Sequence, residues 1–225
     1  MTDHRTRARA LAEEALRRGD AVGWFETLYR EAQGDWTRIP WADLAPNPHV
    51  AAWLGAGDGA PSTGRALIIG CGLGDDAEAV AARGYRVAAF DVAPTAIEAC
   101  RRRYPQTRVE YRVADLFDPP PEWAEGFDLV VEVNTLQVLP DARRAEAMGR
   151  IADLVAPGGT LLVVARGRDE EDAPGRMPWP LARGELGAFS AAGLDERRFE
   201  DFLDDETPRV RRFRVIYRRP RGRTA

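Results

Sequence analysis

A glycine-rich segment, Arg65 to Asp91, constrains the fold of this chain more than any other part of the sequence. It begins with the apolar run Ala66 to Ile69, passes through closely spaced glycines, and ends in a second apolar run that closes on Asp91. Short apolar runs suit parallel strands that are covered on both faces. We therefore predict a strand, a glycine turn, a short helix and a second strand, which together form half of a nucleotide-binding α/β unit.

The spacing of the glycines narrows the choice of ligand. The turn of dinucleotide-binding proteins reads Gly-x-Gly-x-x-Gly and faces a pyrophosphate. Here Gly70, Gly72 and Gly74 alternate with other residues, and Asp75 and Asp76 follow directly. Two carboxylates would repel a pyrophosphate, whereas they would attract a cation or an amine. The pattern therefore favours a positively charged cofactor over a dinucleotide.

The rest of the chain continues the alternation of strands and helices. Further strands are predicted at 109–113, 127–133, 160–165, 194–202 and 210–218. Helices are predicted at 4–18, 21–32, 48–54, 94–103, 141–155 and 183–192. The last two strands are joined by a short acidic turn, so they should form an antiparallel hairpin. The fold class is therefore α/β, with a Rossmann-like, doubly wound sheet of seven strands, one of them antiparallel.

The organisation along the chain is that of one domain, which suits a length of 225 residues. We expect residues 1–60 to form a helical, tryptophan-rich cap and a linker, because 55–64 is rich in Gly, Ser and Pro. The core should span 61–220, and 221–225 should be a tail.

Composition excludes several classes of protein. A net charge of −4 argues against a general nucleic-acid binder, although eight arginines between Arg209 and Arg223 leave an RNA-binding patch as an alternative to an exposed strand and tail. Cys71 and Cys100 have no Cys-x-x-Cys partner, so we expect reduced thiols, a cytoplasmic location and no metal site. The sequence contains neither a long apolar run nor a secretory signal, so no membrane association is expected.

Further motifs follow the glycine segment in a fixed order. Asp115-Leu116 follows the third strand, Phe127 to Val130 forms the fourth, and Leu154 to Gly159 precedes the fifth. This order resembles that of the class I S-adenosylmethionine-dependent methyltransferases. The resemblance implies S-adenosylmethionine as cofactor, whose sulfonium and ammonium groups suit the acidic turn. The residues that the resemblance assigns to the cofactor are Gly70, Cys71, Gly72, Gly74, Asp91, Val92, Asp115, Leu116, Glu132, Val133 and Asn134.

One departure from that family lies on the first strand. Family members often carry an acidic residue before the first glycine of the motif, whereas this chain has Leu67 to Ile69 there. A direct carboxylate contact from this strand to the cofactor ammonium is therefore missing. Asp75, Glu132 or backbone carbonyls are the replacements that the sequence offers.

The amino-terminal region is similar to that of the thiopurine, thiol and halide methyltransferases. The similarity rests on a tryptophan-bearing helix followed by Ile39-Pro40-Trp41 and Pro46-Asn47-Pro48. It implies that Trp41 lies against the cofactor and closes the site. Trp24 and Trp36, together with Trp179 in a Pro-Trp-Pro loop after the fifth strand, are the expected substrate-binding residues.

The chemistry of methyl transfer narrows the acceptor. The transfer is an in-line displacement, so the protein mainly positions and desolvates the reactants. A soft acceptor such as a thiolate needs no strong general base, whereas a hydroxyl usually does. No histidine follows the fourth strand, and His49 is either a base or a loop histidine. We therefore expect a small-molecule thiol or other soft nucleophile as substrate, with no catalytic side chain beyond the candidate His49.

Other interpretations remain open from the sequence. They are oxygen or nitrogen methylation of a natural product, RNA methylation, and dinucleotide-dependent redox chemistry, which the acids after Gly74 disfavour. Arg166, Arg168 and Arg176 are either ligands for an anionic substrate or members of a solvated loop. Both a monomer and a homodimer are compatible with the sequence.

Overall fold

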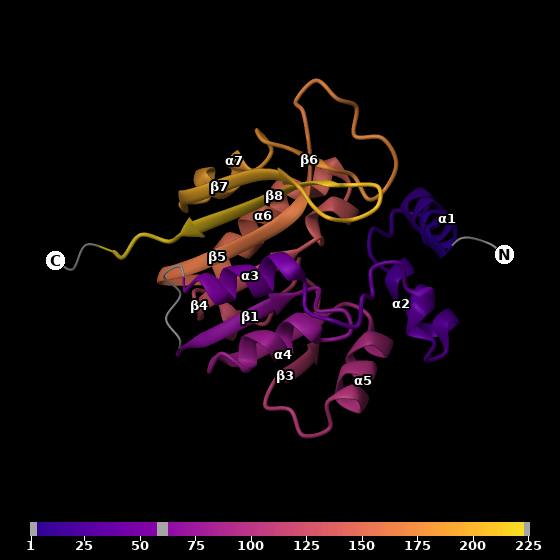
Figure 1. The fold of residues 1–225 in the computed structure, drawn as a ribbon, viewed down its shortest axis with the longest axis horizontal. Coiled ribbons are helices and arrows are strands. Elements are labelled where there is room, and N and C mark those ends of the chain that lie inside the picture. The colour runs from indigo at the N-terminus through magenta and orange to yellow at the C-terminus, as the bar shows by residue number, and fades with distance from the viewer. Residues whose placement is uncertain (1–3, 58–62, 223–225) are drawn as a thin grey trace.

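The computed structural model describes residues 4–57 and 63–222. Its strands form one sheet in the order β3-β2-β1-β4-β5-β8-β7, and β6 pairs with β5 outside this path (Figure 1). The strands are β1 (Arg65–Ile69), β2 (Arg86–Asp91), β3 (Glu110–Val113), β4 (Phe127–Val133), β5 (Val155–Arg168), β6 (Leu181–Ala182), β7 (Asp195–Leu203) and β8 (Arg211–Arg218). The order reverses direction between β1 and β4, which is where open α/β sheets bind ligands.

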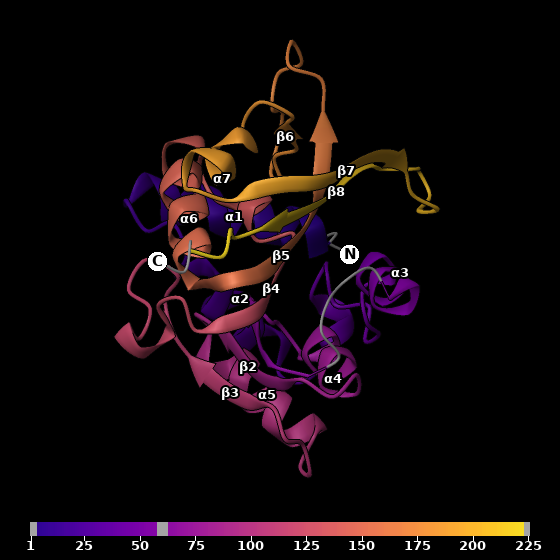
Figure 2. The ribbon, with the colours of Figure 1, turned by 90° about the vertical axis from the view of Figure 1, so that its left-hand side faces the viewer.

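Helices cover both faces of the sheet. They are α1 (His4–Arg17), α2 (Trp24–Ala32), α3 (Pro48–Ala56), α4 (Asp75–Ala81), α5 (Pro94–Arg103), α6 (Asp141–Leu154) and α7 (Gly187–Ala191). Figure 2 shows α6 and α7 on one side of the sheet and α3 and α4 on the other. Figure 1 shows α1 and α2 at one end of the sheet, apart from both layers. Among residues 4–57 and 63–222, no helix has the length and apolar character needed to span a bilayer.

The core follows from the alternation of side chains along buried strands. Leu67 and Ile69 of β1 pack into the cluster that contains α6, whereas Ala66 and Ile68 pack into the cluster on the opposite face. These four residues are at most 3% exposed. Burying a leucine or isoleucine side chain contributes about 2 kcal/mol to folding. This two-sided burial explains why an unbroken apolar run, and not an alternating one, marks the strand.

The predicted α/β sheet is confirmed, but it has eight strands and not seven. The additional strand is β6, whose Leu181 and Ala182 pair in parallel with Gly167 and Arg168 at the end of β5. This strand was not predicted because two residues beside a proline-rich loop are too few to show a hydrophobic periodicity. The single antiparallel insertion is confirmed, because β8 pairs in antiparallel fashion with both β5 and β7.

Some boundaries differ from the predicted ones for local reasons. The second helix begins at Trp24 and not at residue 21, because the Asp20 carboxylate accepts hydrogen bonds from the amides of Val22 (3.1 Å) and Gly23 (2.7 Å) and so stabilises a turn. The last helix is shortened to α7, since the chain from Leu181 to Leu186 is occupied by β6 and a turn. Residues 58–62 of the expected linker and 223–225 of the expected tail lie outside the described residues.

Candidate cofactor and acceptor site

A cavity of about 940 Å³ lies at the carboxyl ends of the central strands. Its walls come from the segments after β1, β2, β3 and β4, from α1 and α2, and from the turn between β7 and β8. A volume near the upper end of small-molecule sites accommodates a cofactor together with an acceptor. The cavity is therefore large enough for an acceptor to lie beside a cofactor.

The glycine turn forms one wall of this cavity. Gly70 and Gly72 line it, with φ angles of 57° and 54°, a region that L-residues with a side chain rarely adopt. A Cβ on Gly70 would lie 2.5 Å from Thr135 Oγ1, and one on Gly72 would lie 3.3 Å from the Tyr29 hydroxyl. Gly74 stands apart from the cavity lining and caps α4, where a Cβ would lie 2.5 Å from the Tyr111 hydroxyl. Packing around the start of α4 therefore requires glycine at position 74.

Asp91 links the glycine turn to the end of β2. One carboxylate oxygen accepts a hydrogen bond from the Gly72 amide (3.0 Å) and the other from the Ala93 amide (2.9 Å). Burial raises the pKa of Asp91 to about 6, although these backbone donors oppose the shift. Asp91 and Val92 both line the cavity, as their expected role requires.

Asp115 and Leu116 also line the cavity, in the loop that follows β3. The Asp115 carboxylate accepts a hydrogen bond from the Phe117 amide (2.9 Å), which holds this loop in a tight turn. Phe90 and Phe117 line the same region, so a carboxylate stands among apolar walls. This environment suits a planar, amino-bearing ring.

Val133 and Asn134 line the cavity after β4, but Glu132 does not. Glu132 is fully buried, and one of its oxygens accepts hydrogen bonds from the amides of Thr135 (2.7 Å) and Leu136 (2.9 Å). Its other oxygen has no hydrogen-bond partner among the described residues, and burial raises its pKa to about 7. The expected contact of Glu132 with the cofactor is therefore corrected, because this side chain points into the core and shapes the turn after β4.

The two acids after Gly74 bind groups of the protein itself, whereas their position in the sequence suggested contact with a positively charged ligand. Asp75 forms a bidentate ion pair with Arg103, at 2.8 Å for each contact, and accepts a hydrogen bond from the Tyr104 hydroxyl. Its charge is therefore largely compensated within the protein. Asp76 accepts a hydrogen bond from the Asn47 amide (2.7 Å), and burial raises its pKa to about 6. Asp76 thus ties the segment before α3 to the start of α4.

Trp41 lines the cavity with 36% of its surface exposed. Its indole Nε1 donates a hydrogen bond to the Tyr29 hydroxyl (3.0 Å), and its ring meets those of Trp24 and Phe25 edge to face, at 5.9 Å and 5.8 Å. A hydrogen bond at one side and aromatic contacts at the other fix the ring over the mouth of the glycine turn. Its expected place beside the cofactor site is consistent with this geometry.

Trp24, Trp36 and Trp179 do not line the cavity, so its geometry does not support their expected contact with substrate. Trp24 is 3% exposed and stacks on Phe25, and all three pack in the cluster around α1 and α2. The residues that reach the cavity in their place are Phe25, Tyr29, Met177 and Pro178. Phe25 and Tyr29 are four positions apart and so share one face of α2, a signal that the sequence contained.

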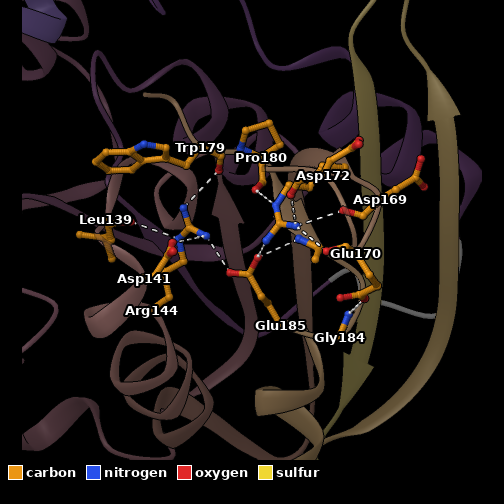
Figure 3. Close-up of polar contacts among 12 residues, drawn as sticks. Leu139, Asp141, Arg144, Asp169, Glu170, Asp172, Trp179, Pro180, Gly184 and Glu185 are labelled. Atoms are coloured by element: carbon orange, nitrogen blue, oxygen red, sulfur yellow. Dashed lines mark hydrogen bonds and ion pairs between the residues drawn. The ribbon is translucent and has the colours of Figure 1, made fainter. Parts of the chain in front are cut away.

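An arginine network holds the loop after β5 in place (Figure 3). The Glu185 carboxylate binds Arg144 (2.7 Å) and Arg168 (2.9 Å), and these two guanidinium groups also donate to the Trp179 and Pro180 carbonyls. Burial opposes ionisation of Glu185, but the Ala182 amide and Arg144 outweigh it and lower its pKa. The charged network therefore presents the neighbouring Met177 and Pro178 to the cavity.

His49 lines the cavity from the first turn of α3. Asn47 caps this helix by accepting the His49 amide at 3.0 Å, and the imidazole packs against Phe202 at 5.0 Å. Burial, followed by the charges of Arg212 and Arg214, lowers its pKa. A neutral imidazole is therefore favoured at neutral pH. The described residues contain no cluster of side chains suited to hold a metal ion.

Comparison with known proteins agrees with this arrangement. Residues 66–159 match the family described as "Methyltransferase domain". The chain is 33% identical over 148 residues to a ubiquinone biosynthesis O-methyltransferase of Xanthomonas axonopodis pv. citri (strain 306), covering 64% of this chain and 58% of that relative. It is 28% identical over 172 residues to probable thiol methyltransferase 2 of Arabidopsis thaliana, covering 72% and 74%. The chain thus spans only somewhat more than half the length of the first relative.

A solved structure shares the fold across almost the whole chain. It is a 1,6-didemethyltoxoflavin-N1-methyltransferase of Burkholderia thailandensis with bound S-adenosylhomocysteine, with a TM-score of 0.66, 19% sequence identity, and coverage of 98% of this chain and 91% of that one. The matched domain, these relatives and the shared fold support a class I S-adenosylmethionine-dependent methyltransferase.

Proposed function

We propose that this protein transfers the methyl group of S-adenosylmethionine to a small thiol or another soft nucleophile. The proposal rests on the ion pairs that carboxylates form with an arginine near the expected position of the transferred methyl group. Asn134 and two nearby carboxylates, those of Asp204 and Glu206, all bind the Arg212 guanidinium. Burial opposes ionisation of Asp204, but Arg212 and the backbone donors outweigh it and lower the pKa of Asp204, so this carboxylate is a poor proton acceptor. An acceptor that ionises easily needs no such base.

The cofactor would occupy the part of the cavity around the glycine turn. Backbone at Gly70 and Gly72 would admit its methionine part, Asp91 would accept hydrogen bonds from the ribose, and Asp115 and Leu116 would meet the adenine. Because Asp75 is paired with Arg103, backbone carbonyls of the glycine turn are the better candidates for the ammonium. The bound cofactor supplies an activated methyl group.

The acceptor would enter beside Asn134, between Trp41 and the loop carrying Met177 and Pro178. The lone pair of the ionised acceptor would form the new bond to the methyl carbon as the bond to the sulfonium breaks, and S-adenosylhomocysteine would leave. The side chains would align the acceptor and exclude water. The likeness to a probable thiol methyltransferase, over nearly three quarters of both chains, supports sulfur as the accepting atom.

Oxygen methylation is the second candidate, and His49 is the observation that favours it. A neutral imidazole in the cavity wall is a competent general base for a phenol or hydroxyl. The likeness to a ubiquinone biosynthesis O-methyltransferase points in the same direction. The two candidates differ in whether a base is required.

An acceptor screen separates the candidates. Purified protein is incubated with S-adenosylmethionine and, in turn, with thiophenol, iodide and catechol, and release of S-adenosylhomocysteine is measured. We expect turnover with thiophenol that survives His49→Asn within a factor of about two. Turnover with catechol alone, lost in His49→Asn by the roughly 100-fold or more typical of a general base, would replace the first proposal with the second.

A further inference from the structure

Arg166 and Arg212 stand directly opposite each other where β5 and β8 pair. The two strands run side by side between β4 and β7 (Figure 1), and both arginines line the cavity. Like charges in opposite positions of an antiparallel pair are destabilising unless each finds a counter-ion. The structure supplies counter-ions to only one of them.

Arg212 is the satisfied member of the pair. It is 5% exposed, and its guanidinium donates to Asp204 (2.8 Å), to Glu206 and to the Asn134 side chain (3.1 Å). The turn between β7 and β8 therefore carries two carboxylates that are engaged by this one arginine. The contact with Asn134 also places the arginine pair next to the segment that follows β4.

Arg166 is the unsatisfied member. Its backbone amide is fixed by the Gln137 side chain (2.8 Å), yet no hydrogen bond or ion pair joins its guanidinium to any residue that the structure describes. Its Nε is buried without a partner. Burial lowers the pKa of Arg166, and the nearby positive charge of Arg212 adds to this effect, although Glu206 and Asp204 partly offset it. A buried donor without an acceptor is costly, and the guanidinium of this cavity-lining residue has no partner among the described residues, so an anionic ligand in the cavity could bind it.

The other arginines of this region have different surroundings. Arg168 binds Glu185 and four backbone carbonyls, and Arg176 is exposed and does not line the cavity. Arg9 lines the cavity but donates to the Met177 carbonyl (2.8 Å). Of the three arginines that the sequence raised as anion ligands, Arg166 alone combines a place in the cavity wall with unused donors.

We propose that Arg166 binds a carboxylate carried by the methyl acceptor, so that the physiological substrate is an anionic small molecule. This inference rests on the proposed methyl transfer to a small molecule. A planar guanidinium pairs with a carboxylate through two parallel hydrogen bonds, which gives orientation as well as affinity. Arg166 begins the half-buried end of β5, close to the segment that carries Asn134, so a carboxylate bound there would orient the rest of the acceptor across the mouth of the cofactor site.

The test compares two thiols that differ in one group, 4-mercaptobenzoate and 4-methylbenzenethiol. With the unaltered protein we expect a lower KM for the carboxylated thiol. Arg166→Gln should raise the KM for 4-mercaptobenzoate roughly 10- to 100-fold, as expected for loss of a charged bidentate contact, and change that for the neutral thiol less than about twofold. Arg176→Gln, in the loop after β5 but outside the cavity lining, is the matched control and should change neither KM.

Two further measurements separate the possible failures. Calorimetric titration of S-adenosylhomocysteine should give the same affinity for Arg166→Gln and the unaltered protein, whereas a parallel loss would assign Arg166 to the carboxylate of the cofactor and overturn the inference. Equal losses with both thiols would also overturn it, because they indicate a structural role.

If neither thiol is methylated, the proposed acceptor atom fails while the anion site can still be measured. Benzoate is then titrated into the complex with S-adenosylhomocysteine. Binding that is weakened by Arg166→Gln and not by Arg176→Gln would support the carboxylate site, and unchanged binding would refute it.

Discussion

The Asp91 carboxylate and the Gly72 amide are joined by a hydrogen bond of 3.0 Å that crosses from the end of β2 to the glycine turn after β1. The same carboxylate accepts the Ala93 amide and lines the cavity. One side chain thus shapes the turn and faces the proposed ribose position. Because both functions depend on its two oxygens, substitutions of Asp91 should affect cofactor binding and stability together.

Asp91→Asn is expected to weaken binding of S-adenosylhomocysteine at least about 10-fold, because the amide retains one acceptor oxygen and loses the charge. Isothermal titration calorimetry measures the affinity, and urea denaturation measures the accompanying change in stability. Asp128→Asn is the matched control, since Asp128 accepts the Arg65 amide at the opposite end of the sheet (2.8 Å). An unchanged affinity in Asp91→Asn would refute the proposed position of the cofactor.

Gly70→Ala should destabilise the protein by about 1–3 kcal/mol and abolish tight cofactor binding. The backbone at Gly70 has a positive φ of 57°, and the new Cβ would lie 2.5 Å from Thr135 Oγ1. Gly149→Ala in α6 provides the control, because a Cβ there meets no atom within 4 Å and should stabilise the helix by about 0.5–1 kcal/mol. Equal stabilities of the two variants by denaturation would contradict the strain assigned to the turn.

The hydrogen bond between Trp41 and Tyr29 should contribute about 0.5–1.5 kcal/mol to the ordering of the segment over the cavity. Trp41→Phe and Tyr29→Phe each remove this bond and retain an aromatic ring. A double-mutant cycle on the affinity for S-adenosylhomocysteine should therefore show that the two losses are not additive. Strict additivity would mean that the contact does not act on cofactor binding.

Glu132 should make the protein less stable as the pH rises. Its pKa is 4.5 as a reference value and about 7 in the folded protein, where burial opposes ionisation. The folded state therefore binds a proton that the unfolded state has released between these values, and the free energy of unfolding falls as the pH rises through about 7. The full effect is on the order of 3 kcal/mol. Burial shifts Asp76 and Asp91 in the same direction, so they add to the decline.

Glu132→Gln isolates this contribution. Its side-chain oxygen can still accept the Thr135 and Leu136 amides, and it carries no ionisable group. We expect urea denaturation between pH 5 and pH 8 to show a smaller loss of stability in the variant than in the unaltered protein. Parallel pH profiles would show that Glu132 is ionised without cost in the folded state.

The parts of the site that could be predicted depend only on the sequence of strands and loops along the chain. The glycines, Asp91 and Asp115 lie at strand ends, and the carboxyl ends of neighbouring parallel strands meet at one edge. The confirmed sheet therefore brings them together without any knowledge of side-chain packing. The same logic failed at Glu132, because one position along a strand reverses the face to which a side chain points.

The remaining parts depend on contacts between distant segments. The difference between Arg166 and Arg212 arises only when β8 lies beside β5 and the turn before β8 supplies Asp204. Nothing adjacent to either arginine in the sequence distinguishes them. The position of Trp24, by contrast, could have been predicted, because the four-residue spacing of Phe25 and Tyr29 defines the face of α2 that reaches the cavity.

The insertion of β8 between β5 and β7 divides the cavity between two parts of the sheet. The walls around the glycine turn follow β1, β2 and β4, which pair in parallel. The wall that carries Arg166 includes the turn between β7 and β8, and β7 joins the sheet through β8 alone. This hairpin pairs with the parallel strands only through β5, so substitutions in it should change the acceptor that is bound while leaving the site of the methyl donor intact.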